Sequence, residues 1–204
     1  MDVFPAPSRL TDRKRAAILD AASAEFRQSG YEATSMDRIA ASARVSKRTV
    51  YNHFPSKDAL FAQIVQQLWE RSAEGLELVY RKDRPLRAQL LELVKQKLRL
   101  LHDPNFVDLA RVAIAAGIHS PERAREMMAR MGEREDGMTV WVRAAASDGR
   151  LKTNDPVFAS TQLQGLVKGF AFWPQITLGQ PPLSPALQKQ VAEASVDMFL
   201  AHYG

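Results

Sequence analysis

A short run of polar side chains in the first third of the sequence has the types and the spacing needed to read DNA. Lys47, Arg48, Thr49, Tyr51 and Asn52 supply two cations, a hydroxyl, a phenol and an amide. Such groups form hydrogen bonds with phosphates and base edges, and the major groove of B-DNA admits one helix. A helix with these side chains on its exposed faces is therefore a candidate DNA-recognition helix.

The flanking residues predict that this helix begins at Lys47 and ends near Phe54. Ser46 is a good N-cap, because its hydroxyl can accept from a free amide of the first turn. Val45 and Val50 have the spacing of a hydrophobic staple, which sets the angle of the incoming chain. Val50 and Phe54 lie four positions apart and share one buried face, which leaves the polar side chains on the other faces.

A second short helix is expected just before it, from about Met36 to Ala43. Thr34 or Ser35 would cap its beginning, and a tight turn would join it to the next helix. From Arg44 to Lys57 the chain has four cations and no Asp or Glu. A solvated basic face would explain the charge alone. The caps, the staple and the preceding helix together favour a helix-turn-helix that binds double-stranded DNA.

The segment Thr34–Leu60 resembles the N-terminal domain of the TetR family of transcriptional regulators. The likeness lies in a Thr before the second helix, an Ile-Ala pair, a turn, a Val-Ser pair and the run TVYNHFPSKDAL. The resemblance implies that Lys47, Arg48, Thr49, Tyr51 and Asn52 lie on the recognition helix. It also implies phosphate contacts from a second, overlapping set: Thr34, Ser35, Tyr51, His53 and Lys57.

The turn departs from the family pattern at Arg44, where the family often has Gly. A non-glycine residue in a left-handed conformation costs roughly 1 kcal/mol. Either Arg44 accepts that cost or it adopts ordinary backbone angles. Its cation is a further candidate for a phosphate contact.

Composition and charge agree with a DNA-binding protein. The net charge is +5, and residues 1–57 hold ten Lys or Arg against six Asp or Glu, so most of the excess is local. The absence of cysteine excludes disulfides and thiolate metal sites. The sequence has no membrane-spanning run and no signal peptide, which predicts a soluble, cytoplasmic protein.

No pattern in the sequence indicates an enzyme. It has no nucleophile elbow, no Gly-rich phosphate loop and no His–carboxylate metal spacing, so neither a cofactor nor a metal ion is expected. Two function classes remain. One is a ligand-responsive regulator, and the other is a DNA-binding protein without an effector. They would share the basic helix and differ by a cavity in the larger domain.

Repeated N-cap residues followed by Pro predict an all-α fold of about nine helices. The expected organisation is a flexible arm (1–10), a helix-turn-helix domain (11–56) and a helical ligand-binding and dimerisation domain (57–204). The expected helices outside the helix-turn-helix span residues 11–29 with Gly30 as C-cap, 56–80, 85–101, 106–116, 120–146, 156–178 interrupted at Trp173-Pro174, and 185–201.

The resemblance further implies a homodimer on a palindromic operator, because two related recognition helices double the contact with DNA. Residues that would form the dimer interface, or else pack inside one subunit, are Phe158, Leu166, Phe170, Leu187, Val191 and Met198. The family usually holds a small-molecule effector in the larger domain. Pocket candidates, which would equally suit an ordinary core, are Phe106, Leu109, Met127, Met131, Met138, Trp141, Phe170 and Trp173. Few charges lie among them, so the expected effector is apolar or aromatic.

Overall fold

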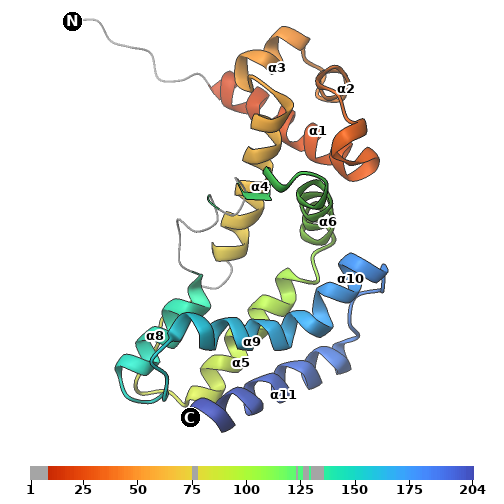
Figure 1. The fold of residues 1–204 in the computed structure, drawn as a ribbon. Coiled ribbons are helices and arrows are strands. Elements are labelled where there is room, and N and C mark those ends of the chain that lie inside the picture. Colours follow the sequence, from red (N-terminus) through yellow and green to blue (C-terminus); the bar gives the residue numbers. More distant parts are fainter. Residues whose placement is uncertain (1–8, 75–77, 123, 126–128, 130–135) are drawn as a thin grey trace, which may run out of the picture. The chain divides into compact units, whose positions relative to one another are not determined.

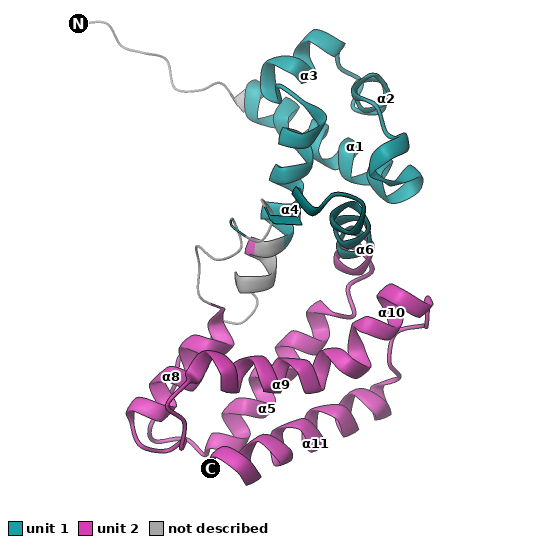
Figure 2. Ribbon diagram, viewed as in Figure 1, with its two compact units in different colours: residues 1–68, 109–130 teal, residues 69–108, 131–204 magenta. Residues whose placement is uncertain are grey.

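The structure is a computed structural model that describes residues 9–74, 78–122, 124–125, 129 and 136–204. Every regular element in these residues is a helix (Figure 1), so the predicted all-α fold is confirmed. None of the described helices combines the length and the hydropathy needed to span a membrane. The chain divides into two compact units, residues 1–68 with 109–130 and residues 69–108 with 131–204 (Figure 2).

Unit 1 contains the predicted helix-turn-helix and is held together by one apolar cluster. Its most deeply buried members include Ile18, Phe26, Ile39, Val50 and Leu60. The helices that lie in it wholly or in part are α1 (Arg9–Ala33), α2 (Met36–Ser42), α3 (Lys47–His53), α4 (Lys57–Glu74) and α6 (Pro104–His119).

Helix α1 extends beyond its predicted end. Gly30 interrupts the helical geometry (φ 76°, ψ 171°), but a further turn follows it as far as Ala33. Glycine accepts this positive φ without a Cβ clash. The turn places the Tyr31 ring in the core, where its centroid lies 5.6 Å from that of Phe26 and 4.8 Å from that of Phe61. Gly30 is therefore a kink within the first helix as well as the end of its regular part.

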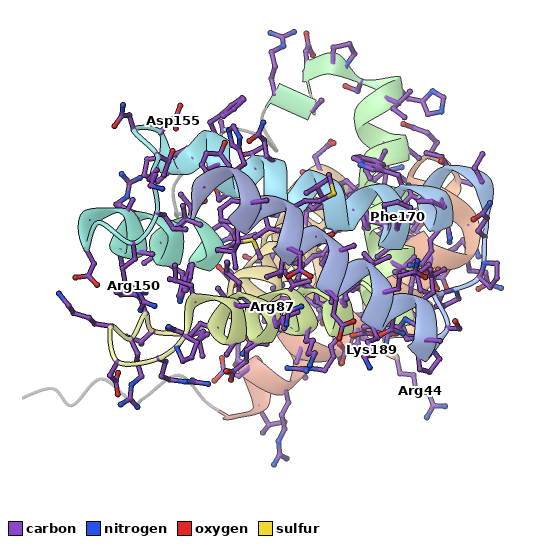
Figure 3. The ribbon with its side chains drawn as sticks, turned by 90° about the horizontal axis from the view of Figure 1, so that it is seen from below. Arg44, Arg87, Arg150, Asp155, Phe170 and Lys189 are labelled. Carbon is purple, nitrogen blue, oxygen red and sulfur yellow. The ribbon has the colours of Figure 1, made fainter. Side chains whose placement is uncertain are left out.

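Unit 2 is a helical bundle around α9. This helix packs against α5, α8, α10 and α11, and their apolar side chains, among them Leu90, Leu163 and Val196, are fully buried. On the surface, the guanidinium of Arg87 on α5 forms an ion pair with Asp197 on α11 at 2.7 Å (Figure 3). The bundle comprises α5 (Leu86–Leu100), α8 (Gly137–Ser147), α9 (Pro156–Ala171), α10 (Trp173–Leu178) and α11 (Pro185–Tyr203).

Two predicted helix boundaries in the larger domain are wrong. Residues 78–80 are not helical, so the helix expected to reach residue 80 ends earlier. A continuous helix from 120 to 146 is excluded because Asp136 has extended backbone angles (φ −63°, ψ 136°) and α8 begins only after it. The interruption near Trp173-Pro174 is confirmed. Phe172 separates α9 from α10 there, and Pro174 provides no amide to continue the helix.

Candidate functional site

The two short helices of the helix-turn-helix begin at serine caps. The Oγ of Ser35 accepts from the amide of Arg38 at 3.3 Å, and the Oγ of Ser46 accepts from the amide of Thr49 at 3.1 Å. The hydroxyls of Ser46 and Thr49 also share a hydrogen bond of 2.8 Å. These bonds satisfy amides that a helix leaves free at its beginning. The cap predicted at Ser46 is confirmed, and Ser35 rather than Thr34 caps α2.

The turn between α2 and α3 depends on a left-handed residue. Arg44 has φ 55°, the only positive φ of a non-glycine residue in the described part of the chain. Its amide donates to the carbonyl of Ala41 at 3.1 Å, and the next amide, of Val45, donates to Ala40 at 3.0 Å. Of the two conformations considered for Arg44, the left-handed one is therefore present, and the exposed guanidinium is left beside the recognition helix.

Helix α3 has one buried side and one exposed polar side. Val50 and the adjacent Phe54 are buried in unit 1, whereas Arg48, Tyr51 and Asn52 are exposed. Within the described residues, Arg48 has no hydrogen bond and no ion pair, so its five donors remain available to a phosphate or a guanine. The sequence pattern and the burial agree on which face of α3 points outward.

Lys47, at the beginning of α3, has an ion-pair partner in the structure. Its Nζ lies 2.8 Å from Oδ1 of Asp37 on α2, and this hydrogen-bonded contact raises the pKa of Lys47. Both side chains are exposed, so water and salt weaken the pair. A base or phosphate can therefore compete with Asp37 for this ammonium group.

Thr34 does not occupy the position expected of a phosphate ligand. It is only 2% exposed, and its Oγ1 donates within the protein, at 2.7 Å to the carbonyl of Gly30 and 3.2 Å to that of Glu25. The hydroxyl thus stabilises the end of α1. Ser35 is exposed and His53 half-buried, and these two keep their predicted phosphate role as a hypothesis.

The ammonium group of Lys57 is used inside unit 1. It donates to the carbonyls of Tyr31, Thr34 and Glu32 at 2.9, 3.0 and 3.3 Å, and it lies 4.4 Å from the centroid of the Tyr31 ring. The phenol of Tyr31 in turn donates to Asp58 at 2.5 Å. An ammonium group has three donors. Lys57 therefore joins the beginning of α4 to the last turn of α1 and to Thr34, which leads into the helix-turn-helix.

The structure separates the residues predicted to line a ligand pocket. Phe106, Met138 and Trp141 are buried in unit 2. Leu109 packs against the core of unit 1, and Phe170 and Trp173 are 57% and 46% exposed, so these three do not belong to an apolar pocket inside unit 2. Met127 and Met131 lie outside the described residues. Of the six described candidates, three therefore remain, and the predictions for Met127 and Met131 stand as they were.

The residues predicted for a dimer interface mostly lie on an outer row of α9 and α11. Phe158, Leu187 and Met198 are exposed and Leu166 is half-buried. Phe170 continues the row on α9 (Figure 3). Val191 is the exception, because it is 5% exposed and packs within its own chain. Its predicted interface role is wrong because it lies on the side of α11 that packs on α5 and α9.

The sequence analysis did not predict a group of charged residues in unit 2. Lys97 on α5 is 5% exposed, and Lys168 on α9 and Asp136 before α8 are half-buried. The helical spacing of Leu90, Val94 and Lys97 could have indicated the burial of Lys97, because a residue seven positions after Leu90 lies on the same, inward face of the helix. Among the described residues, no group of three His, Cys, Asp or Glu side chains is placed to bind a metal ion.

A capped helix pair with an exposed polar recognition face, joined to a separate helical bundle, defines a helix-turn-helix DNA-binding protein. Residues 18–64 match the family model described as bacterial regulatory proteins of the tetR family. Residues 88–204 match the model of the C-terminal domain of AefR-like transcriptional repressors. The chain belongs to the TetR family of transcriptional regulators.

Individual relatives agree with this assignment. The HTH-type transcriptional regulator RutR of Escherichia coli (strain K12) is 30% identical over 164 residues, which cover 76% of this chain and 75% of RutR. A TetR family regulator from Pseudomonas syringae pv. tomato str. DC3000 has a similar crystal structure, with a TM-score of 0.83, 54% identity and coverage of 94% and 97% of the two chains. The flavonoid-responsive regulator FrrA has a TM-score of 0.76 at 30% identity, with coverage of 93% and 96%.

Proposed function

We propose that this regulator is a homodimeric repressor that binds a palindromic operator through α3 and is released by a small molecule held in unit 2. The observation that carries the DNA-binding part is the composition of α3, in which Arg48, Tyr51 and Asn52 are exposed while Val50 on the opposite side is buried. The proposed DNA-contacting set is Ser35, Arg44, Ser46, Lys47, Arg48, Thr49, Tyr51, Asn52 and His53, with Lys57 as a positioning residue.

Footprinting of the purified protein on the DNA upstream of its own gene, with excess competitor, tests the proposal. Two twofold-related recognition helices should protect a palindrome whose half-sites lie about 34–36 Å apart, or a multiple of that distance. If the protein binds DNA without a defined footprint, and competitor DNA abolishes this binding, the result would instead favour a DNA-binding protein that does not read sequence. Absence of binding even at low salt would contradict both.

Replacement of Tyr51 by Ala should weaken binding to operator and to scrambled DNA by the same factor, about a hundredfold for the dimer, because each subunit loses one hydrogen bond to a charged group, worth about tenfold. The reason is that a phenol on a phosphate fixes the protein on DNA without reading bases. Fluorescence anisotropy on both duplexes at one salt concentration measures the effect. Tyr51→Phe is the control that removes only the hydroxyl. A loss confined to operator DNA would show that Tyr51 reads a base instead.

The outer row of α9 and α11 supports the proposed dimer. Phe158 and Phe170 are each 57% exposed and Met198 is 60% exposed, although large apolar side chains in contact with water favour association. Gly165 and Gly169 lie on the same exposed side of α9, with nothing within 4 Å of the position of an added Cβ. Small residues allow a partner helix to approach closely, so two copies of this surface can form a four-helix interface.

Replacement of Phe170 by Glu should convert the dimer to a monomer and abolish the operator footprint. A carboxylate placed in an apolar interface loses its hydration without a partner, which costs at least about 2 kcal/mol in each of the two subunits. Sedimentation equilibrium measures the change in association. Val140→Glu is the matched control, because Val140 is 50% exposed on α8, away from the row. A Phe170→Glu protein that stays dimeric would exclude this surface as the interface.

The effector part of the proposal is supported by the relatives and by the separate bundle. The flavonoid-responsive relative shares the fold of nearly the whole chain. In unit 2, Phe106, Met138 and Trp141 supply the apolar side chains with which a ligand would pack. Release from DNA requires only that the ligand bind the DNA-free conformation more tightly, by about 1–3 kcal/mol of coupling.

A further inference from the structure

Unit 2 contains a buried cation that has no ion-pair partner in the described part of the chain. Lys97 is 5% exposed, and within the described residues its ammonium group has no hydrogen bond and no ion pair. Lys168 is half-buried nearby, and its charge acts on Lys97. Buried lysines are rare unless they are paired, because removal of the ammonium group from water is costly. A buried lysine with a second, half-buried lysine beside it therefore needs an explanation.

Several other buried polar side chains of the bundle have partners within it. Gln89 donates to the carbonyls of Arg81 and Arg84 at 2.9 and 3.0 Å and accepts from the amide of Arg81 at 2.8 Å. Thr139 and Ser160 share a hydrogen bond of 2.6 Å. Within the described residues, Lys97 shares its lack of a hydrogen-bond partner with two buried atoms of the bundle, Oε1 of Gln96 and Nε1 of Trp141.

Of the described carboxylates, that of Asp136 acts on both lysines, and one of its two oxygens already accepts a hydrogen bond. Asp136 interacts electrostatically with both Lys97 and Lys168, but its Oδ2 accepts a hydrogen bond of 2.5 Å from the amide of Gln164. Burial lowers the pKa of Lys97 to about 8 and also lowers the pKa of Lys168, against the opposite influence of Asp136. Among the described residues, two cations act against one anion, so this group of side chains is one negative charge short of neutrality.

A bound organic anion would supply that charge. Its carboxylate would accept hydrogen bonds from both ammonium groups, and such charge-assisted bonds are about twice as strong as neutral ones. Helix α8, which begins after Asp136 and packs on α9, supplies buried apolar and aromatic side chains, Met138 and Trp141. The indole Nε1 of Trp141 has no acceptor in the described part of the chain. A ring-bearing acid therefore fits this unit better than a neutral hydrocarbon.

We infer that the effector of this regulator is a small organic carboxylate with an aromatic or apolar body, and that Lys97 and Lys168 bind its carboxyl group. The inference rests on the proposed function, in which unit 2 holds the effector. It adds a carboxyl group to the expected apolar or aromatic effector, an expectation that considered the pocket candidates and not the two lysines.

Matched pairs of acids and amides test the charge requirement directly. Benzoate, phenylacetate and 2-naphthoate, each compared with its own uncharged carboxamide, are titrated into the full-length dimer without DNA at neutral pH. Thermal unfolding and calorimetry record binding. At least one acid should stabilise the protein, and its amide should bind at least about tenfold more weakly, as the loss of a charge-assisted hydrogen bond predicts.

Lysine variants then test which side chains bind the carboxylate of the acid. Lys97→Met and Lys168→Met should each weaken binding of the acid by about tenfold or more and leave any binding of the amide unchanged. Lys95→Met, an exposed lysine on the same helix, should bind the acid as the wild type does. Equal binding of acid and amide, no binding of any acid, or undiminished binding by both folded lysine variants would overturn the inference.

Operator footprinting with the same compounds separates this inference from the proposed function. If an acid binds through Lys97 but the footprint persists, the inferred ligand site is correct. The proposal that this ligand releases the protein from DNA is then wrong. If a neutral compound removes the footprint while every acid fails to bind, the regulator is ligand-responsive and the assignment of an anionic ligand is wrong.

Discussion

Replacing Lys97 by Met is expected to stabilise the ligand-free protein by about 3 kcal/mol at neutral pH, because the wild-type protein holds a buried ammonium group that has no ion pair among the described residues. Methionine fills similar apolar volume with a flexible side chain and leaves no charge to desolvate. Removal of a buried ionic group in favour of a well-packed apolar one is often stabilising. The same substitution should weaken binding of the proposed anion, so stability and ligand binding should change in opposite directions.

The pH dependence of the free energy of unfolding follows from the direction in which folding shifts the pKa of Lys97. In the unfolded chain Lys97 has its ordinary pKa of 10.5, and in the folded protein burial lowers that pKa to about 8. Below pH 8 both states carry the proton, and the folded state bears the full penalty. Between about pH 8 and 10.5 the folded state loses its proton first, so the wild-type free energy of unfolding rises by about 3 kcal/mol from this group.

Urea unfolding at equal protein concentration measures the effect for both proteins across this pH range. The difference between Lys97→Met and wild type should be largest near neutrality and should vanish near pH 10.5. Lys95→Met should follow the wild type throughout, because its side chain is exposed on the same helix. A Lys97→Met protein less stable than wild type at pH 7 would mean that Lys97 is already neutralised by the protein.

Replacing Lys57 by Met is expected to destabilise the helix-turn-helix by about 1–3 kcal/mol and to reduce operator affinity, with no change in its salt dependence. Three carbonyls, of Tyr31, Glu32 and Thr34, would lose the ammonium group that they share. Because that group is engaged inside the protein, its removal leaves the number of neutralised phosphates unchanged. The affinity falls because α2 and α3 lose a fixed position relative to α4.

Affinity measured over a range of salt concentrations distinguishes this role from that of a phosphate ligand. The slope of log K against log salt falls by about 0.9 for each phosphate that the protein no longer neutralises. Arg48→Met should show that fall in each subunit, whereas Lys57→Met should keep the wild-type slope and lower the melting temperature. Lys14→Met, at an exposed position of α1, is the control for stability. If Lys57→Met instead reduces the salt slope and leaves the melting temperature unchanged, Lys57 binds a phosphate.

The helix-turn-helix was predictable from the sequence because its features depend on residues that are close together in the chain. Ser46, Val50 and Phe54 predict the beginning and the buried face of α3 because a cap and an i, i+4 pair act within one or two turns. The structure confirms the cap and the burial. The all-α fold was likewise predictable, since each helix start has its own signal of a cap residue or a proline.

Partners distant in sequence were not predictable in this way. The three carbonyls bound by Lys57 lie 23 to 26 positions earlier in the chain. The burial of Thr34 depends on the kink at Gly30, beyond which α1 continues. In both cases the side chain is of the type that binds phosphate, and only its surroundings show that it serves the protein's own structure.

The larger unit shows the same division between local and tertiary information. The sequence alone determined that Phe158, Phe170 and Met198 lie on helices, and the spacing of α5 turns Lys97 toward its apolar face. Only the packing of α9 against α5, α8 and α11 decided that Val191 is buried and Phe170 exposed, and that Lys97, Lys168 and Asp136 interact. Helical periodicity specifies the side of each helix on which a residue lies, whereas tertiary packing determines which sides are buried and which charges meet.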